Sequence, residues 1–386
     1  MRTIGPRKTA GKTATGRVVL GDKRVGAILA EALEVREEVD RYTHGFHTWP
    51  AGLHPDAARM LIDAFPGKSV GDPFMGGGTI LVEAMAAGRF AFGRDVSRVS
   101  LRIAKARTST AGEDVLTKMR STARKLAAEA PQAKELPPDE ILRSIQAWYE
   151  PHVLTELEHI RRGVFASEGP ERPLLEAVFS SLLVKASFRK SDTSAKREPY
   201  HRPIGTTAVL FHKKARELGR RIAALREAVP PNTPAPDVAR MDARRWTTPS
   251  PLDLVVTSPP YPSTYDYLPL QHLRRIWFGE VEEDAAEIGP RRDWREGARG
   301  AVSKWRNDTE LWTAAVAKSL TRDGHLVVVI GDGLTPAGSI DTSDATEKAA
   351  AAAGMTSVAR ASVERADPGR DTTRWEHIFA FKNARS

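Results

Sequence analysis

The chain has 386 residues, 58 Lys and Arg against 49 Asp and Glu, a formal net charge of +9 at pH 7, and no cysteine. Its hydrophobic fraction of 41% is typical of a folded globular protein, and the sequence holds no run of about 18 apolar residues that could cross a membrane. The missing cysteine excludes disulfides, Cys-ligated metal centres and thiolate nucleophiles. The positive charge favours an anionic partner such as nucleic acid, and because no secretory signal follows the basic start, we expect a cytoplasmic protein.

The first predicted elements are a basic arm and two helices. Residues 1–24 mix Gly, Thr, Lys and Arg without hydrophobic period, which predicts a mobile arm. A short helix is predicted over Val25–Val39 and a second over Pro55–Ala64, where a Pro-Gly pair ends it. We assign residues 1–41, the arm with its short helix, to a region that precedes the catalytic domain.

A strand–helix–strand unit is predicted next. Ser69–Phe74 is a short apolar run bounded by glycine, which predicts a buried strand. Thr79–Ala87 has helical spacing and ends at a glycine, and Arg89–Asp95 predicts a second strand. Together they form the βαβ unit of an α/β protein with a parallel sheet.

A long helical stretch follows this unit. From residue 97 to about residue 229, apolar residues recur at three and four positions, which predicts helices over Ile141–Phe165, Leu174–Phe188 and Thr207–Ala228. A block of this length does not fit inside a minimal sheet. We therefore assign residues 109–235 to an inserted helical subdomain that ends in a proline-rich linker.

Strand patterns resume after the linker. Two apolar strands and a terminal antiparallel hairpin are predicted over Leu252–Thr257, His325–Gly331, and Thr356–Glu364 with Glu376–Phe381. We expect residues 42–108 and 236–386 to form one catalytic domain with a Rossmann-like α/β sheet, into which the helical subdomain is inserted.

A glycine-rich loop joins the predicted strand and helix of the βαβ unit, in the sequence Gly71-Asp-Pro-Phe-Met-Gly-Gly-Gly-Thr79. Its glycines let backbone amides approach a ligand closely. Gly77 and Gly78 stand where a phosphate-binding P-loop has Lys and Ser or Thr, and Leu81 stands where the dinucleotide fingerprint has its last glycine. A smaller nucleoside cofactor fits better, and Asp95 at the end of the next strand is the expected partner of its ribose.

A second signature, Ser258-Pro-Pro-Tyr261, follows the strand over Leu252–Thr257. Its two prolines fix the backbone. The signature resembles motif IV of the S-adenosylmethionine-dependent amino-methyltransferases of DNA, which implies that an exocyclic amine on a base receives the methyl group. Such an amine is a poor nucleophile until acceptors draw on its hydrogens, and the side chain of Ser258 and the carbonyl of Pro259 can be those acceptors. Tyr261 can stack on a base taken out of a duplex. Direct attack on a methyl donor needs no thiolate, whereas methylation at cytosine carbon 5 needs one.

The two signatures, Asp-Pro-Phe-Met-Gly-Gly-Gly-Thr with Gly-Arg-Asp-Val-Ser and later Thr-Ser-Pro-Pro-Tyr, resemble motifs I, II and IV of the S-adenosylmethionine-dependent amino-methyltransferases of DNA. The resemblance covers roughly residues 42–108 and 238–382, and Gly77 departs from the commoner Gly-Ser-Gly-Thr loop. It implies a class I methyltransferase sheet and S-adenosylmethionine as cofactor, with Asp72 at the methionyl part and Asp95 at the ribose. The residues implied as cofactor contacts in these motifs are Asp72, Phe74, Gly76, Gly77, Gly78, Thr79 and Asp95, and those implied in catalysis are Ser258, Pro259, Pro260 and Tyr261.

Two further segments are similar to motifs of the same family. His47–Leu53 is similar to motif X, which closes over the methionyl end, and implies Thr48, Trp49 and Pro50 as cofactor contacts; a packed aromatic segment is the alternative. Asp242 resembles the motif III acid that meets the adenine amine of the cofactor. The ten histidines show no metal-ligand spacing, so we expect no metal.

The positive charge is concentrated in the helical insertion. Between Lys185 and Arg226, twelve Lys and Arg stand against three Asp and Glu, an excess of nine that equals the excess of the whole chain. Such a surface suits the phosphates of DNA, although a solvated helix face would also be basic. The strongest candidates for DNA contacts lie in a single loop: Arg189, Lys190, Lys196 and Arg197.

The resemblance also bears on which base receives the methyl group. Ser at the first position of the tetrapeptide favours cytosine N4, and adenine N6 in DNA stays open. A tRNA guanine N2 methyltransferase shares the fold and the glycine loop, but carries an N-terminal RNA-binding domain for which the few residues before motif X leave no room. A non-catalytic DNA-binding protein on a methyltransferase fold is the alternative from another class, against which the retained Asp72, Asp95, Ser258 and Tyr261 argue. A cognate restriction endonuclease is a possible partner.

Overall fold

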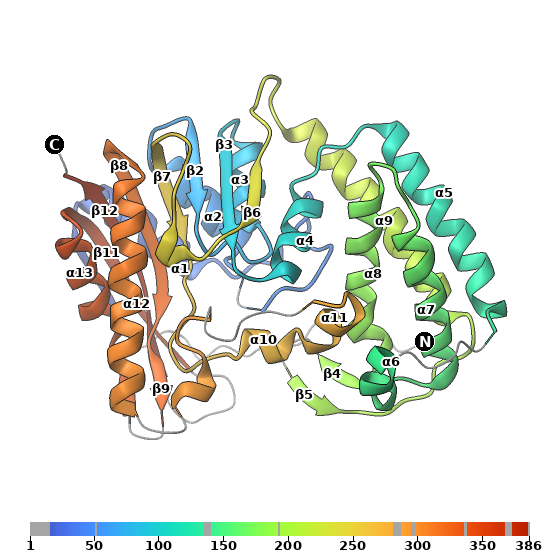
Figure 1. The fold of residues 1–386 in the computed structure, drawn as a ribbon. Coiled ribbons are helices and arrows are strands. Elements are labelled where there is room, and N and C mark those ends of the chain that lie inside the picture. Colours follow the sequence, from blue (N-terminus) through green and yellow to red (C-terminus); the bar gives the residue numbers. More distant parts are fainter. Residues whose placement is uncertain are drawn as a thin grey trace.

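The structure, a computed structural model, describes residues 16–50, 52–134, 140–191, 194–280, 287–294, 298–335, 338–366 and 373–384. Within these residues the chain forms an eight-stranded sheet in the order β1-β11-β12-β8-β7-β2-β3-β6 (Figure 1). The strands of this sheet are β1 (Arg17–Gly21), β2 (Ser69–Asp72), β3 (Phe90–Asp95), β6 (Asp237–Arg240), β7 (Leu252–Thr257), β8 (Leu320–Gly331), β11 (Met355–Ala366) and β12 (Thr373–Asn383).

The strand directions define the fold class. β6, β3, β2, β7 and β8 run parallel, whereas β12 is antiparallel to both β8 and β11. This is a Rossmann-like α/β sheet with a terminal antiparallel hairpin, so the predicted class I methyltransferase fold is confirmed. Because parallel strands end at the same edge, the carboxyl ends of β2, β3 and β7 lie together, which is where ligands bind in open α/β sheets.

The two faces of the sheet are covered by helices. Because side chains alternate along a strand, Leu254 and Val256 of β7 pack on one face and Val255 packs on the other. The first face is covered by α1 (Lys23–Glu34), α2 (Pro55–Asp63) and α3 (Thr79–Ala86), and the second by α12 (Ala298–Lys318) and α13 (Thr342–Ala352). β9 (Gly333–Thr335) and β10 (Gly338–Ile340) form a small separate ladder between β8 and α13.

The predicted mobile arm was wrong for its last residues. Arg17–Gly21 pairs with β11 as the edge strand β1, and α1 begins at Lys23 because the side chain of Asp22 accepts a hydrogen bond from the backbone N–H of Val25. The helix also ends at Glu34, before the expected Val39, because Val35 has an extended backbone conformation. The part of the arm over residues 1–15 lies outside the described residues.

The helical block follows α4 (Arg98–Arg107) and lies beside the β3 and β6 edge of the sheet (Figure 1). Its members are α5 (Glu113–Glu129), α6 (Glu140–Ile145), α7 (Pro151–Phe165), α8 (Arg172–Ala186) and α9 (Thr206–Ala228). They share one hydrophobic cluster, which Phe46, Leu273 and Trp277 join from outside the block. The single helix expected over Ile141–Phe165 is divided into α6 and α7, with a 3₁₀ turn over Gln146–Trp148 between them.

One further segment differs from the sequence predictions. The block is not wholly helical, because β4 (Arg189–Ser191) and β5 (Ser194–Arg197) form a hairpin after α8. After the second signature the chain forms two short helices, α10 (Tyr267–Leu270) and α11 (His272–Trp277), which meet at Gln271. Figure 1 shows the hairpin next to α10 and α11.

Candidate active site

A cavity opens at the carboxyl ends of β2, β3 and β7. Its empty space is about 940 Å³, a figure that includes solvent at the open mouth. Among the residues predicted from sequence, the cavity is lined by Trp49, Pro50, Asp72, Phe74, Gly76, Gly77, Thr79, Asp95, Asp242, Ser258 and Pro260. Thr48, Gly78, Pro259 and Tyr261 do not line it. Segments far apart in the sequence therefore meet at one sheet edge.

The glycine loop needs glycine for two reasons. Gly76 and Gly78 have positive φ angles of 48° and 79°, which other residues rarely adopt. In addition, a Cβ atom at Gly76 would lie 2.5 Å from Nε1 of Trp49. Gly78 is the N-cap of α3, and since it has no side chain, the N–H groups of the first turn of α3 receive no capping hydrogen bond from it.

Asp72 is buried at the end of β2, with 2% of its surface exposed. Its Oδ1 accepts hydrogen bonds from the backbone N–H of Phe74 at 3.0 Å and from Oγ1 of Thr257 at 2.7 Å. Burial, with a smaller contribution from the charge of Asp95, raises the pKa of Asp72 to about 7, against these two hydrogen bonds. A cationic group bound in the cavity would favour the ionised form of this carboxyl.

Asp95, the last residue of β3, holds the glycine loop. Its Oδ2 accepts a hydrogen bond from the N–H of Gly76 at 3.0 Å, and its Oδ1 accepts one from the N–H of Ser97 at 2.9 Å. Asp242 lies across the cavity at the start of the 3₁₀ turn over Ala243–Arg245. Although burial opposes it, hydrogen bonds from Arg244 keep the pKa of Asp242 below its usual value. The cavity therefore has a carboxylate at Asp242 as well as at Asp95.

The segment before α2 forms a wall of the cavity. The indole of Trp49 stacks on the ring of Tyr267, with centroids 6.4 Å apart and an interplanar angle of 12°. The buried guanidinium of Arg107 donates hydrogen bonds to the carbonyls of Gly77, at 3.1 Å, His44, at 2.6 Å, and His47. Arg107 therefore ties the glycine loop to the segment that contains Trp49.

The residues of the second signature do not all face the cavity. Ser258 and Pro260 line the cavity, but Tyr261 does not. The ring of Tyr261 packs against Gly331, where an added Cβ would lie 2.7 Å from Cε2 of the ring, and its hydroxyl donates to Oε1 of Glu376 at 2.9 Å. Its ring is thus not in the cavity, where stacking on a base requires it. Among the aromatic residues that follow Ser258 in the sequence, Tyr267 lines the cavity.

Sequence reasoning missed several cavity residues. Tyr267 and Glu287 line the cavity, and Oε1 of Glu287 accepts a hydrogen bond from the N–H of Tyr267 at 2.5 Å. The signal for Tyr267 was present, since Tyr-Asp-Tyr stands after the second signature with three residues between them. Arg107 and Glu287 stand in no recognisable pattern.

The predicted DNA contacts lie on the β4–β5 hairpin, and one of them needs correction. Lys190, Lys196 and Arg197 are exposed. Arg189 is only 7% exposed, and its guanidinium donates to the carbonyls of Ser194 at 2.9 Å and Leu270 at 2.7 Å. Arg189 therefore fastens the hairpin to α10 and does not present its charge to solvent.

The rest of the basic stretch is partly neutralised. Lys214 and Arg221 pair with Glu217, and Arg226 donates to the carbonyl of Ala111. Other cations of α9 are exposed, namely Lys213, Arg216 and Arg220. The excess charge is thus shared between the hairpin and one face of α9.

In the described ranges, no group of three or more His, Asp or Glu side chains is arranged to hold a metal ion. None of the helices the structure describes combines the length and the apolar character needed to span a membrane.

Comparisons with known proteins give one partial sequence match. No family model matches the chain. Over 72 residues the chain is 38% identical to the type II methyltransferase M.MvaI of Kocuria varians, a match that covers 17% of this chain and 16% of that protein. The match therefore spans about a sixth of the relative's length.

Solved structures are similar at low identity. TrmN from Thermus thermophilus matches at a TM-score of 0.33 and 12% identity, over 85% of this chain and 48% of that one. The rRNA methyltransferase AviRa from Streptomyces viridochromogenes matches at a TM-score of 0.33 and 12% identity, over 92% and 95% of the two chains. The fold class itself follows from the strand order and directions described above.

Proposed function

We propose that this protein is a DNA methyltransferase that transfers the methyl group of S-adenosylmethionine to the exocyclic amine of a flipped base, cytosine N4. The observation that carries the proposal is the hydrogen bond from Oγ1 of Thr257 to Oδ1 of Asp72, at 2.7 Å. It joins the glycine-loop carboxylate to the residue directly before Ser258, so that both signatures border one cavity.

The residues of the cavity fit this cofactor in shape and chemistry. Gly76 and Gly77 let Trp49 and Arg107 pack closely on the loop, since a Cβ at either glycine would meet those side chains, and this packing holds the loop at the edge of the cavity. An ammonium group and ribose hydroxyls need acceptors when buried, and Asp72 and Asp95 supply carboxylates for them. Asp242 would serve the adenine amine. Bound there, the cofactor supplies an electrophilic methyl group on a sulfonium.

The proposed chemistry is direct transfer to nitrogen. Ser258, which lines the cavity, accepts an amine hydrogen, and Pro259 and Pro260 fix the backbone that follows it. The amine would then be held in position for attack on the methyl group that the cofactor supplies. The absence of cysteine agrees with this route, because no covalent enzyme intermediate is formed.

DNA as the substrate is supported by the partial match to a type II methyltransferase and by the exposed cations of the β4–β5 hairpin, which lies next to α10 and α11 (Figure 1). We further propose that residues 42–108 and 236–386 form the catalytic domain and that residues 109–235 bind DNA. Ser258 favours cytosine N4 over adenine N6, and the tRNA guanine and non-catalytic alternatives rank below both.

Incubation of the purified protein with methyl-labelled S-adenosylmethionine and DNA, followed by nucleoside chromatography, tests the proposal. The expected product is N4-methylcytosine. N6-methyladenine would overturn the choice of base, 5-methylcytosine would overturn the mechanism, and label in tRNA but not in DNA would overturn the substrate.

Asp72 makes cofactor affinity depend on pH. Its pKa in the free protein is about 7, so below pH 7 it is protonated and loses its attraction for the ammonium group. We expect S-adenosylmethionine to bind about tenfold more weakly at pH 6 than at pH 8, by calorimetry. By the same shift, the unfolding free energy of the free protein gains a contribution from Asp72 as the pH falls below 7.

The control for this prediction is 5′-methylthioadenosine, which has no ammonium group and whose affinity is expected to stay constant over the same range. Asp72→Asn is expected to bind S-adenosylmethionine weakly at every pH in that range. A pH-dependent affinity that persists in Asp72→Asn would assign the titration to another group.

A further inference from the structure

Among the described residues, four carboxylates line the cavity, and one of them has no part in the proposed cofactor contacts. Asp72, Asp95 and Asp242 serve the ammonium group, the ribose and the adenine amine in the proposed complex. Glu287 lines the same cavity and is only 5% exposed. Because a buried carboxylate is unfavourable unless other groups satisfy it, its partners show what it can still bind.

The partners of Glu287 hold its carboxylate from two sides. Oε1 accepts a hydrogen bond from the N–H of Tyr267 at 2.5 Å, and Oε2 accepts one from Nη1 of Arg292 at 2.5 Å. Each oxygen of an ionised carboxylate can accept about two hydrogen bonds. With one donor from the described residues at each oxygen, the fixed carboxylate can also accept from a group bound in the cavity.

The segment that contains Glu287 packs on the residues that follow the second signature. The N–H of Ser263 donates to the carbonyl of Gly289 at 3.1 Å. An added Cβ at Gly289 would lie 3.4 Å from Cα of Pro262, the residue directly after the signature. These contacts fix the segment against the turn that begins at Ser258, and both Ser258 and Glu287 line the cavity.

The target amine needs two acceptors, because an exocyclic amine has two hydrogens. Ser258 supplies one acceptor in the cavity. The carbonyl predicted from sequence as the second acceptor belongs to Pro259, which does not line the cavity. As the amine attacks, positive charge passes from the sulfonium to the nitrogen, and a fixed carboxylate such as that of Glu287 stabilises this charge better than a neutral carbonyl does.

The surroundings of Glu287 also suit a group that receives a proton. Burial, with a smaller contribution from the charge of Asp266, raises the pKa of Glu287 above its usual value, against the guanidinium of Arg292 and the N–H of Tyr267. A carboxylate with a raised pKa accepts a proton more readily than an ordinary one.

We propose that Glu287 is a catalytic residue whose carboxylate accepts the second hydrogen of the target amine and takes the proton that methyl transfer releases. The inference rests on the proposed function, because it requires a base and the cofactor in the same cavity.

The proposed step is balanced. The nitrogen lone pair forms the N–C bond while the C–S bond pair returns to sulfur. The pair of one N–H bond stays on nitrogen as its proton passes to an oxygen of Glu287. The products are a neutral methylated amine, a neutral thioether and a carboxylic acid, which gives its proton to water at the open mouth of the cavity.

Two variants separate this role from a purely structural one. Glu287→Gln and Arg292→Met both break the ion pair, but only Glu287→Gln removes the carboxylate from the cavity. In single-turnover methylation of DNA at saturating S-adenosylmethionine, we expect Glu287→Gln to slow transfer about 10²-fold. Arg292→Met should slow it by less than about tenfold, the usual limit for the loss of a partly exposed ion pair. Calorimetry should show that both variants fold and bind the cofactor.

The pH profile of the same rate gives a second readout. Protonated Glu287 cannot accept the proton, so the wild-type rate should fall as the pH drops through the pKa of Glu287. Loss of the Arg292 cation raises this pKa further, so the fall should occur at higher pH in Arg292→Met. Glu287→Gln should lose this dependence. Saturating cofactor keeps Asp72 paired with the ammonium group and thus out of the profile.

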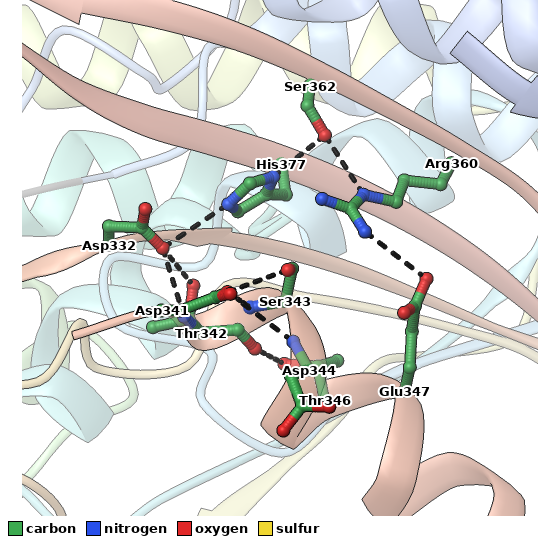
Figure 2. A network of polar contacts seen from close by, with 10 residues as sticks. All are labelled: Asp332, Asp341, Thr342, Ser343, Asp344, Thr346, Glu347, Arg360, Ser362 and His377. Atoms are coloured by element: carbon green, nitrogen blue, oxygen red, sulfur yellow. Dashed lines mark hydrogen bonds and ion pairs between the residues drawn. The ribbon is translucent and has the colours of Figure 1, made fainter. Parts of the chain in front are cut away.

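A carboxylate outside the cavity provides the control. Glu347 of α13 also pairs with a guanidinium, that of Arg360 at 3.5 Å, in the polar network around His377 (Figure 2). Glu347 does not line the cavity. Glu347→Gln should therefore keep the wild-type rate and pH profile, whereas Glu287→Asp, which retains the charge, should keep part of the rate that Glu287→Gln loses.

Equal losses in Glu287→Gln and Arg292→Met, with the wild-type pH profile in both, would leave Glu287 a structural role and overturn the inference. A wild-type rate in Glu287→Gln would overturn it as well, and in both cases the proposed function stands. A wild-type protein that binds the cofactor but methylates no DNA would instead contradict the proposed function, and the inference with it.

Discussion

Ser258→Ala is expected to slow methyl transfer to DNA by about 10²- to 10³-fold in a single turnover, while the affinity for S-adenosylmethionine stays at the wild-type value. The substitution removes one fixed acceptor at the point where the amine nitrogen gains charge, and losses of that size are typical when one such polar group is deleted. Because the contact is made to the base and not to the cofactor, the effect belongs in the rate of transfer. Rapid-quench measurement with labelled cofactor gives this rate, and calorimetry gives the affinity.

Ser250→Ala is the matched control, since Ser250 is exposed just before β7, at the end of that strand opposite to Ser258. It should behave as wild type. If Ser258→Ala transfers the methyl group at the wild-type rate, the assignment of Ser258 as an acceptor is wrong, whatever the product.

The triple change Lys190→Ala/Lys196→Ala/Arg197→Ala should weaken DNA binding about 10²-fold at 0.15 M salt and make its salt dependence shallower. If each cation neutralises one phosphate, the slope of the logarithm of affinity against the logarithm of salt falls by about 0.9 per contact, or about 2.7 in all. The loss should be nearly the same for every DNA sequence, because phosphate contacts do not read bases. Fluorescence anisotropy over a salt series measures both quantities.

The exposed cations of α9 offer a control of equal charge. Lys213→Ala/Arg216→Ala/Arg220→Ala removes three positive charges from another face of the helical block. A loss of slope in this triple variant, with the hairpin triple unchanged, would move the DNA surface from the hairpin to α9. Calorimetry with S-adenosylmethionine should show no change in either variant.

The fold could be predicted where its signals are local. The glycine loop marks where β2 ends and α3 begins, and the apolar run before Ser258 is typical of a buried strand. The parallel strands at the centre of the sheet could therefore be predicted from the sequence. Pairing between distant segments leaves no such signal. β1 is a strand only because β11 offers it partners, and the short hairpin that contains Arg189 is enclosed by helical sequence on both sides.

The candidate site also has residues that local motifs predict and residues whose role depends on distant segments. Asp72, Asp95 and Ser258 stand at strand ends inside motifs, and the parallel sheet was enough to bring them to one cavity. The orientation of Tyr261 depends on Glu376, which lies 115 residues further along the chain. Arg107 acts by donating to backbone carbonyls of two other segments. Because every residue has a carbonyl, no pattern of side chains in the sequence predicts this role.

The shared core of the helical block limits how this protein can be rebuilt. Phe46, Leu273 and Trp277 complete the hydrophobic cluster of the block, although they belong to segments that also shape the cavity and its surroundings. A swap of the whole insertion between enzymes would leave these side chains without their partners, so the block is not an interchangeable module. The β4–β5 hairpin is fastened to α10 by the buried Arg189 and exposes Lys190, Lys196 and Arg197, so it is the smaller unit to exchange if the proposed affinity for DNA is to be changed.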